Sequence, residues 1–172
     1  LKTFKRDSIQ GDSKVVDLFK KLGVDTIFNE TDNAITLRKN QRKIENFLNL
    51  NLIETPDIAQ TIAVTCFGLG ISCELTGLKT LKIKETDRLL ALKIELQKLG
   101  AELTITEKSL FLKQRKTINK NIVIDTYDDH RMAMSFAALY LKVPIIINNP
   151  NVVSKSYKTF WKDLQKIGGK VL

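Results

Sequence analysis

The chain has 172 residues, of which 43% are hydrophobic and 27% are charged, and its formal net charge at pH 7 is +9. This composition is typical of a globular protein, and the length fits one domain that buries about 70% of its unfolded surface. No apolar stretch approaches the roughly 20 residues that a membrane helix needs, which argues against an integral membrane protein.

Three explanations of the positive charge remain open: binding of nucleic acid, binding of an anionic small molecule, and a solvated basic surface. The sequence has no zinc-finger spacing and no aromatic-rich basic motif of the kind that stacks on bases. Many lysines are scattered over expected helix faces and turns, which favours solvation for most of them. A basic nucleic-acid-binding module without catalytic activity is kept as the alternative to an enzyme.

The cysteines and the N-terminal sequence indicate the cellular compartment in which the protein is expected. Cys66 lies in an apolar helical run and Cys73 in an expected strand, without metal-binding spacing, so we expect buried, inert thiols in a reducing environment. The chain starts at Leu1 and has no hydrophobic signal region. We therefore expect a cut rather than a natural start at this position, and a cytoplasmic protein.

Three expected helices end in Lys-Leu-Gly or Lys-Ile-Gly, at Gly23, Gly100 and Gly168. Glycine after a helix adopts the left-handed conformation cheaply, and the preceding lysine suits the negative end of the helix dipole. Paired strands separated by polar turns, as in hairpins, follow the first two of these helices. The strands are expected at residues 26–28 and 34–37, and at residues 102–105 and 109–112.

A second kind of helix is expected over residues 58–69 and 131–141, with strands after them at 71–78 and 143–147. Asp57 and Asp129 stand at corresponding places early in these helices, where a carboxylate caps free amides. The predicted order is helix, three strands, helix, strand, helix, three strands, helix, strand, helix. It favours a single α/β (α+β) lobe over residues 1–172, built from βαβαββ repeats at about 1–78 and 79–150 and a partial third at 151–172.

Two charged clusters precede helices, at residues 84–88 and 128–131. Lys84 and Arg88 conflict with the positive end of a helix dipole, and a bound anion would remove that conflict. The structural alternative is a capping cluster with a local ion pair between Glu85 and Arg88. His130 lies in the second cluster, and a single histidine is more often structural than functional.

The helix starts also have structural explanations. Thr86 or Asp87 can cap one helix, and Asp57 can cap another. Lys155 alone would be a surface charge before a last helix capped by Ser156. That helix is expected to bury Phe160, Trp161, Leu164 and Ile167.

The four helix starts face one cleft if the repeated units pack with pseudosymmetry. The cleft would gather four cations, two carboxylates and one imidazole, namely Lys84, Arg88, Arg131, Lys155, Asp57, Glu85 and His130. Such a site suits a polyanionic substrate that undergoes proton transfer.

Three motifs stand out, namely Leu-Lys-Ile-Lys-Glu-Thr-Asp-Arg-Leu at residues 81–89, Asp-Asp-His-Arg-Met-Ala-Met at 128–134 and Val-Ser-Lys-Ser-Tyr at 153–157. Together they resemble the 5-enolpyruvylshikimate-3-phosphate synthase (EPSP synthase) family. The segments at residues 8–12 and 55–57 fit the same family in the same order. The resemblance covers nearly the whole chain, but only the C-terminal part of the enzyme, less than half of it.

The resemblance implies one lobe of an inverse α/β barrel. It implies transfer of the carboxyvinyl group from phosphoenolpyruvate to the 5-hydroxyl of shikimate 3-phosphate, with release of phosphate, in the shikimate pathway of aromatic amino-acid biosynthesis. It also implies no metal or organic cofactor, a missing N-terminal lobe as partner, and a monomeric full enzyme that binds neither nucleic acid nor membranes. Because the other lobe supplies much of the phosphate-binding machinery, we expect this fragment alone to be inactive.

The resemblance assigns catalytic roles to three residues. Asp57 would accept the proton of the shikimate hydroxyl, with Lys84 helping to bind that substrate. Glu85 would handle a proton at the methylene carbon of phosphoenolpyruvate, and His130 would be a supporting polar group nearby.

The resemblance also implies binding roles. Arg88 and Arg131 would clamp the phosphoenolpyruvate carboxylate, where a planar bidentate fork is valuable, and Lys155 would meet its phosphate. Thr80 stands where the family often has an Asn that contacts the shikimate ring. An RNA 3'-phosphate cyclase of the same repeat architecture is a rival, but its nucleophilic histidine motif is not matched.

Overall fold

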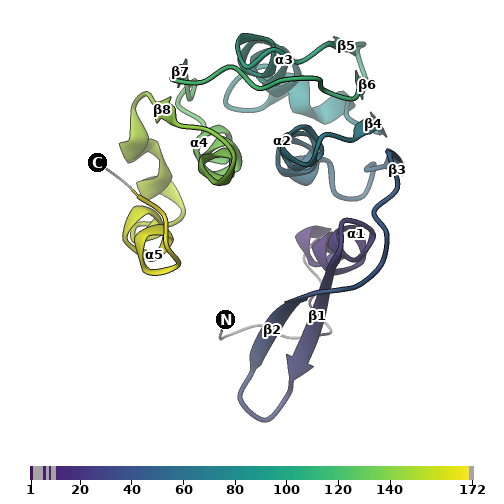
Figure 1. Ribbon diagram of the computed structural model, residues 1–172, viewed down its shortest axis with the longest axis vertical. Coiled ribbons are helices and arrows are strands. Elements are labelled where there is room, and N and C mark those ends of the chain that lie inside the picture. The colour runs from purple at the N-terminus through teal and green to yellow at the C-terminus, as the bar shows by residue number, and fades with distance from the viewer. Residues whose placement is uncertain (2–5, 7, 9–10, 171–172) are drawn as a thin grey trace. The chain divides into compact units, whose positions relative to one another are not determined.

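The structure is a computed structural model that describes Leu1, Arg6, Ser8 and residues 11–170 (Figure 1). The chain divides into two compact units, Leu1–Asn46 and Phe47–Leu172. Along the chain, the α-helices and strands follow the order that the sequence predicts, with short 3-10 turns added between them.

The first unit is a helix followed by a β-hairpin. Its elements are η1 (Gly11–Lys14), α1 (Val15–Lys21), β1 (Val24–Asn29) and β2 (Ala34–Lys39). The strands pair antiparallel, with Val24 opposite Lys39, which confirms the predicted hairpin. Gly23 after α1 has φ +90°, as the predicted helix stop requires. In the 8–12 motif, Ile9 and Gln10 lie outside the described residues.

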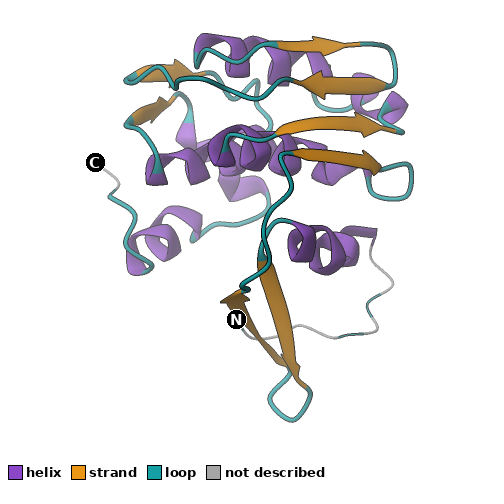
Figure 2. Ribbon diagram, turned by 45° about the vertical axis from the view of Figure 1, so that its right-hand side comes forward, coloured by secondary structure: helices purple, strands orange, loops and turns teal. Residues whose placement is uncertain are grey.

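The second unit contains a four-stranded sheet. Across the sheet, the strands are β3 (Phe47–Asn51), β4 (Ser72–Thr76), β6 (Ser109–Leu112) and β5 (Leu103–Ile105). The β3–β4 pair is parallel and the other two pairs are antiparallel, which confirms the second predicted hairpin. Along β6, Leu110 and Leu112 are fully buried while Phe111 is 39% exposed. This alternation places one face of the sheet against the helices and the other toward solvent (Figure 2).

Helices connect and cover the strands of the second unit. Its helices are η2 (Pro56–Ile58), α2 (Ala59–Leu69), η3 (Lys79–Ile83), α3 (Arg88–Lys98), α4 (His130–Ala137), η4 (Ala138–Leu141), η5 (Pro150–Lys155) and α5 (Phe160–Lys166). A second, two-stranded parallel sheet pairs β7 (Ile122–Ile124) with β8 (Ile145–Ile147). In the described part of the chain, no helix is both long and apolar enough to cross a membrane.

The repeated pattern is visible in two parallel crossovers, β3-α2-β4 and β7-α4-β8. A full βαβαββ succession runs from β3 to β6, over residues 47–112. This succession continues across the repeat boundary expected at residues 78 and 79.

The buried stripe of α3 agrees with its predicted helical spacing. Leu89, Leu92, Leu96 and Leu99 have no exposed surface. Burial of a leucine side chain contributes roughly 1.5–3 kcal/mol, so this stripe fixes α3 firmly in the core. Because Arg88 is the first residue of α3, the buried leucines also fix the position of its backbone.

The last helix differs from expectation. Helix α5 begins at Phe160 after Thr159, and Ser156 lies at the end of η5, so the predicted cap at Ser156 is wrong. No residue of α5 is buried as predicted, because Phe160, Trp161 and Leu164 are half-buried and Ile167 is 77% exposed. Phe160 and Trp161 pack against a small cluster of Ala133, Val152 and Val153.

Both cysteines are free and fully buried, as predicted. Cys66 lies on α2 and Cys73 on β4. A hydrogen bond with Cys66, followed by burial, raises the pKa of the Cys73 thiol far above its ordinary value. The thiol is therefore protonated and unreactive.

Candidate active site

Arg88 is the centre of the candidate site. Its side chain is only 2% exposed, yet all three guanidinium nitrogens donate to carboxylates. Nε donates to Asp129 Oδ2 at 2.5 Å, Nη1 to Asp57 Oδ1 at 2.9 Å and Nη2 to Glu85 Oε2 at 2.6 Å. A buried charge is costly unless it is paired in this way. The arginine thus ties together segments that are far apart in the sequence.

The local sequence explains the start of α3. Asp87 caps the helix, because its Oδ1 accepts a hydrogen bond from the amide of Leu90 at 3.0 Å. Asp87 is thus the cap among the two predicted candidates. The structural alternative is present in part, since the Glu85–Arg88 pair has formed. Carboxylates from two other elements also surround Arg88, so local capping does not account for the cluster.

Asp57 departs from its predicted capping role. Pro56 is already the first residue of η2, so Asp57 lies inside the helical turn rather than before it. Helix α2 has no side-chain cap at its start. Instead, the Asp57 carboxylate receives Arg88 Nη1 and lies 3.2 Å from Lys84 Nζ. Both of these contacts are made by Oδ1 of Asp57, whereas Oδ2 lies 3.9 Å from Arg131 Nη2.

Asp129 joins the second charged cluster to the first. It is fully buried and caps α4, as predicted, with Oδ1 accepting from the amide of Arg131 at 2.8 Å. Its other oxygen accepts from Arg88 Nε. The Arg131 guanidinium in turn donates to the backbone carbonyl of Asp57 at 3.1 Å. The starts of η2, α3 and α4 therefore converge.

Lys155 on η5 contacts the segment just before α4 and not the carboxylates around Arg88. Its Nζ donates to the backbone carbonyl of Asp128 at 2.9 Å, and Asn149 donates to the Asp128 side chain at 3.0 Å. His130 is the half-buried first residue of α4, and its imidazole makes no hydrogen bond or ion pair with any residue that the structure describes. Thr80 is exposed on η3 and makes no side-chain hydrogen bond to any residue that the structure describes.

The site has a buried frame and an accessible rim. Arg88 and Asp129 form the frame, whereas the side chains of the rim residues are between 29% and 44% exposed. The rim consists of Asp57, Lys84, Glu85 and Arg131. Two accessible cations can bind an anion, and two carboxylates beside them can accept or donate protons. No described group of three or more His, Cys, Asp or Glu side chains could hold a metal ion.

The sequence predicted a capping role alone for Asp129 and not its ion pair with Arg88. The signal was present, because an acidic residue sits beside His130 and Arg131 in a motif far from residue 88. Only the fold, which brings the starts of α3 and α4 together, reveals the partner. One carboxylate oxygen serves each role, so capping and ion pairing are compatible.

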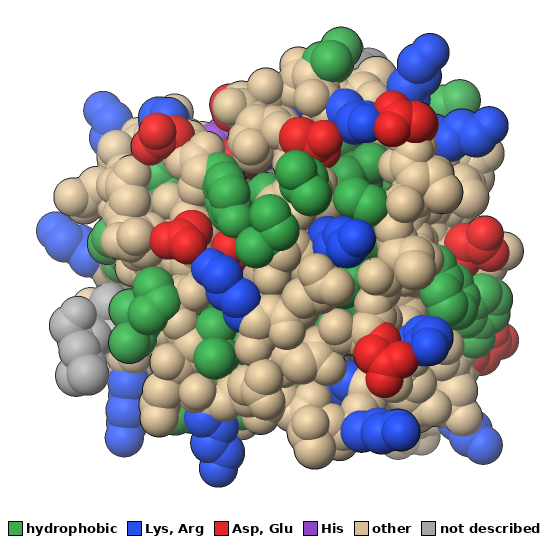
Figure 3. Space-filling model, turned by 90° about the horizontal axis from the view of Figure 1, so that it is seen from above, with side chains coloured by type: hydrophobic (Ala, Val, Ile, Leu, Met, Phe, Trp, Pro, Cys, Tyr) green, Lys and Arg blue, Asp and Glu red, His purple; other side chains and the backbone are tan. Residues whose placement is uncertain are grey.

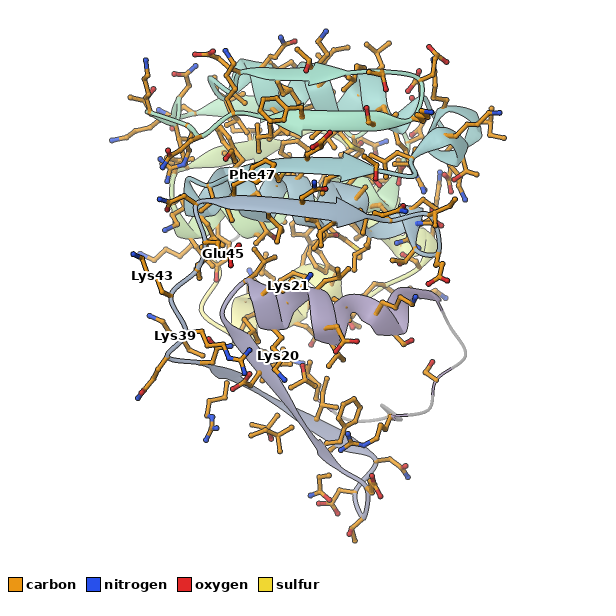
Figure 4. All side chains as sticks on the ribbon, turned by 90° about the vertical axis from the view of Figure 1, so that its right-hand side faces the viewer. Lys20, Lys21, Lys39, Lys43, Glu45 and Phe47 are labelled. Carbon is orange, nitrogen blue, oxygen red and sulfur yellow. The ribbon has the colours of Figure 1, made fainter. Side chains whose placement is uncertain are left out.

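Several basic side chains outside the site are solvated. Lys20 and Lys21 on α1, Lys39 at the end of β2 and Lys43 beyond it are all exposed (Figure 4). On the face of the molecule in Figure 3, lysine and arginine side chains are interspersed with aspartate and glutamate. This distribution agrees with the solvated-surface explanation for most of the positive charge.

Comparisons with known proteins identify the family. The family model of EPSP synthase (3-phosphoshikimate 1-carboxyvinyltransferase) matches residues 1–164. A 3-phosphoshikimate 1-carboxyvinyltransferase of Bacteroides fragilis strain YCH46 is 45% identical over 166 residues, which cover 95% of this chain and 40% of the relative. One from Neisseria meningitidis serogroup C is 36% identical over 156 residues, or 90% of this chain and 36% of the relative.

Solved structures agree. EPSP synthase from Acinetobacter baumannii aligns with a TM-score of 0.68 and 25% identity, over 91% of this chain and 39% of that one. The enolpyruvyl transferase NikO from Streptomyces tendae aligns with a TM-score of 0.62 at 15% identity, over 90% and 34% of the two chains, and supports the fold alone. The chain has part of an inverse α/β barrel and spans about 40% of the length of the Bacteroides relative. It belongs to the EPSP synthase (3-phosphoshikimate 1-carboxyvinyltransferase) family.

Proposed function

We propose that this chain forms one part of an enzyme that transfers the carboxyvinyl group of phosphoenolpyruvate to the 5-hydroxyl of shikimate 3-phosphate. Membership of the family supports the reaction, and the Arg88-centred cluster supports the placement of the site. The single observation that carries the proposal is the convergence of three helix starts on one buried arginine. The chain spans about 40% of the Bacteroides relative, so the remaining part would supply the other side of the cleft.

The accessible carboxylates provide the proton transfers. Asp57 would take the proton of the 5-hydroxyl as its oxygen attacks the central carbon of phosphoenolpyruvate. Glu85 would protonate the methylene carbon, which completes the addition. The Glu85 carboxylate would then take a proton back from the resulting methyl group as the C–O bond to phosphate breaks, which restores the carbon–carbon double bond and releases phosphate. The proton on Asp57 would pass to solvent.

The cations would hold the two anionic substrates. Lys84 would bind shikimate 3-phosphate beside Asp57, and Lys155 would meet the phosphate of phosphoenolpyruvate. Arg131 and Arg88 would clamp the carboxylate of phosphoenolpyruvate. His130 would assist as a nearby polar group, and Thr80 would contact the shikimate ring from η3.

The geometry of Arg88 adds a condition to this clamp. Its Nε is held by the buried Asp129, whereas Nη1 and Nη2 point to the partly exposed Asp57 and Glu85. A substrate carboxylate would therefore displace one of these two side chains. The displacement would release that side chain for proton transfer when substrate arrives.

The proposal is tested by a chimera in which residues 1–172 replace the matching region of the Bacteroides fragilis relative. We expect the chimera to release phosphate from shikimate 3-phosphate and phosphoenolpyruvate and to rescue a bacterium that cannot make aromatic amino acids. The isolated chain should show neither activity. A folded chimera without turnover, combined with salt-dependent binding of the isolated chain to arbitrary DNA, would favour the nucleic-acid-binding alternative.

A further inference from the structure

A second buried carboxylate lies on α3, away from the cluster around Arg88. Glu95 is fully buried, two turns along the helix, and both its oxygens are occupied. Oε1 accepts from the Tyr127 hydroxyl at 2.7 Å. Oε2 accepts from the backbone amide of Asp125 at 3.1 Å and from Lys98 Nζ at 2.8 Å. A buried carboxylate with three donors is well compensated, so its contacts hold tightly.

Lys98 extends the same network. Its Nζ also donates to Asp125 Oδ2 at 2.8 Å, while Asn148 donates to the other oxygen of Asp125 at 3.0 Å. Although desolvation lowers it, hydrogen bonds to Asp125 and Glu95 leave the pKa of Lys98 above its ordinary value. Hydrogen bonds from Lys98 and Asn148 lower the pKa of Asp125. The charged forms of both side chains are therefore favoured.

The segment held by this network leads directly into the candidate site. Asp125 and Tyr127 are contacted by Glu95, and Asp129 is contacted by Arg88. Helix α3 thus fastens the segment of residues 125–129 at both ends, seven helix positions apart. On the far side of the segment, Lys155 and Asn149 hold Asp128.

The fastened segment has an unfavourable backbone conformation. Tyr127 and Asp128 have φ of +53° and +54°, in the left-handed region that side chains other than glycine rarely occupy. Such a conformation persists only where the surroundings determine it. The hydroxyl contact from Glu95 falls on Tyr127, the first of these two residues.

We propose that Glu95 is a positioning residue, which holds residues 125–129 in this conformation and so places Asp129, His130 and Arg131 at the site. The effect of Glu95 on catalysis rests on the proposed function, which takes the cluster around Arg88 as the active site. The positioning itself rests on the contacts of Glu95 alone. Glu95 lies beyond the substrate-facing residues and acts through the segment that it holds.

The only histidine of the chain supplies a direct probe. In the 172-residue chain labelled with ¹⁵N, the imidazole correlation of His130 should move by more than its linewidth in Glu95→Gln. In this variant the remaining side-chain oxygen can still accept from the Tyr127 hydroxyl. The new side-chain NH₂ group would stand where Oε2 was, so the backbone amide of Asp125 and the ammonium of Lys98 would both lose their acceptor there. Tyr127→Phe removes only the hydroxyl contact and should give a smaller shift in the same direction.

Glu102→Gln is the matched control, because this exposed carboxylate also loses an ion pair, to Lys113. It should leave the His130 signal in place. If Glu95→Gln fails to fold, Tyr127→Phe decides the outcome. An unmoved His130 signal in the folded variants would overturn the positioning role.

The chimera separates this inference from the proposed function. Glu95→Gln should lower its kcat/KM at least about tenfold, with Glu102→Gln unchanged. An inactive parent chimera with a displaced His130 signal would refute the proposed function and leave the positioning role standing. If the parent chimera is active, and Glu95→Gln changes neither its turnover nor the His130 signal of the 172-residue chain, the positioning role alone is refuted.

Discussion

At the residue scale, the arrangement of charge around Arg88 is the feature that distinguishes a site from a set of helix caps. Three carboxylates meet one guanidinium, and only Glu85 is close to it in sequence. The sequence predicted that Asp57, Glu85 and Arg88 gather, because charged residues stand at the starts of expected helices, but it did not predict that Asp129 joins them. It could not predict that Arg88 is buried, since its burial depends on how the starts of η2, α3 and α4 converge in the fold.

Replacement of Arg88 by lysine should destabilise the chain. One ammonium cannot reproduce three directed contacts, and the buried Asp129 would lose its Nε partner. We expect a loss of about 3 kcal/mol in the free energy of unfolding, measured with urea at neutral pH. The exposed Arg38→Lys on β2 serves as control and should change stability by less than about 0.5 kcal/mol. Equal stabilities of the two variants would contradict the role of Arg88 as the buried frame.

At the element scale, local rules predicted most helix boundaries. Glycine stops at Gly23, Gly100 and Gly168 have φ near +90°, and Asp87 and Asp129 cap their helices. The rules failed where a residue had a stronger partner elsewhere. Asp57 could cap α2 by position, but the cations of other elements hold its carboxylate. A single sequence carries no direct signal for such competition between segments.

Helix α5 contains a local network of hydrogen bonds that gives it a dependence on pH. The carboxylate of Asp163 accepts from Lys166 Nζ, Thr159 Oγ1 and the Tyr157 hydroxyl. The bond from Lys166, followed by the one from Thr159, lowers the pKa of Asp163 from 3.8 to about 2. Because the folded-state pKa is depressed, this stabilisation is complete above 3.8 and is lost as the pH falls toward 2.

Trp161, the only tryptophan, lies on α5 and reports its loosening through fluorescence. We expect its emission to change as the pH falls from 3.8 toward 2. Asp163→Asn should show the altered emission already at neutral pH and lack this transition. If the variant and the parent titrate identically, Asp163 does not hold the helix.

At the scale of the whole molecule, most of the core belongs to one unit. Among the described residues, the buried hydrophobic side chains other than Leu22 and Ile35 lie within Phe47–Leu172. Length and composition predicted one lobe and gave no sign of this division. The reason is that a count of apolar residues does not say which of them share a core.

The second unit should therefore fold without the first. A chain of residues 47–172 should unfold cooperatively on heating, with near the same Tm as residues 1–172, measured by circular dichroism. Its buried faces pack against each other across the four-stranded sheet, α2, α3 and α4. Absence of a cooperative transition in the shorter chain would show that the first unit is needed for the core.

The central claim is that the charged cluster performs chemistry and does not merely hold helices together. Glu85 tests it most directly, because its side chain is 44% exposed and carries little of the buried frame. In the active chimera, Glu85→Gln should lower kcat by about 100-fold or more with Tm unchanged. Glu102→Gln, with its own exposed ion pair, should leave both quantities as they are. A Glu85→Gln enzyme with parental kcat, or one whose lost activity follows lost stability, would contradict the claim.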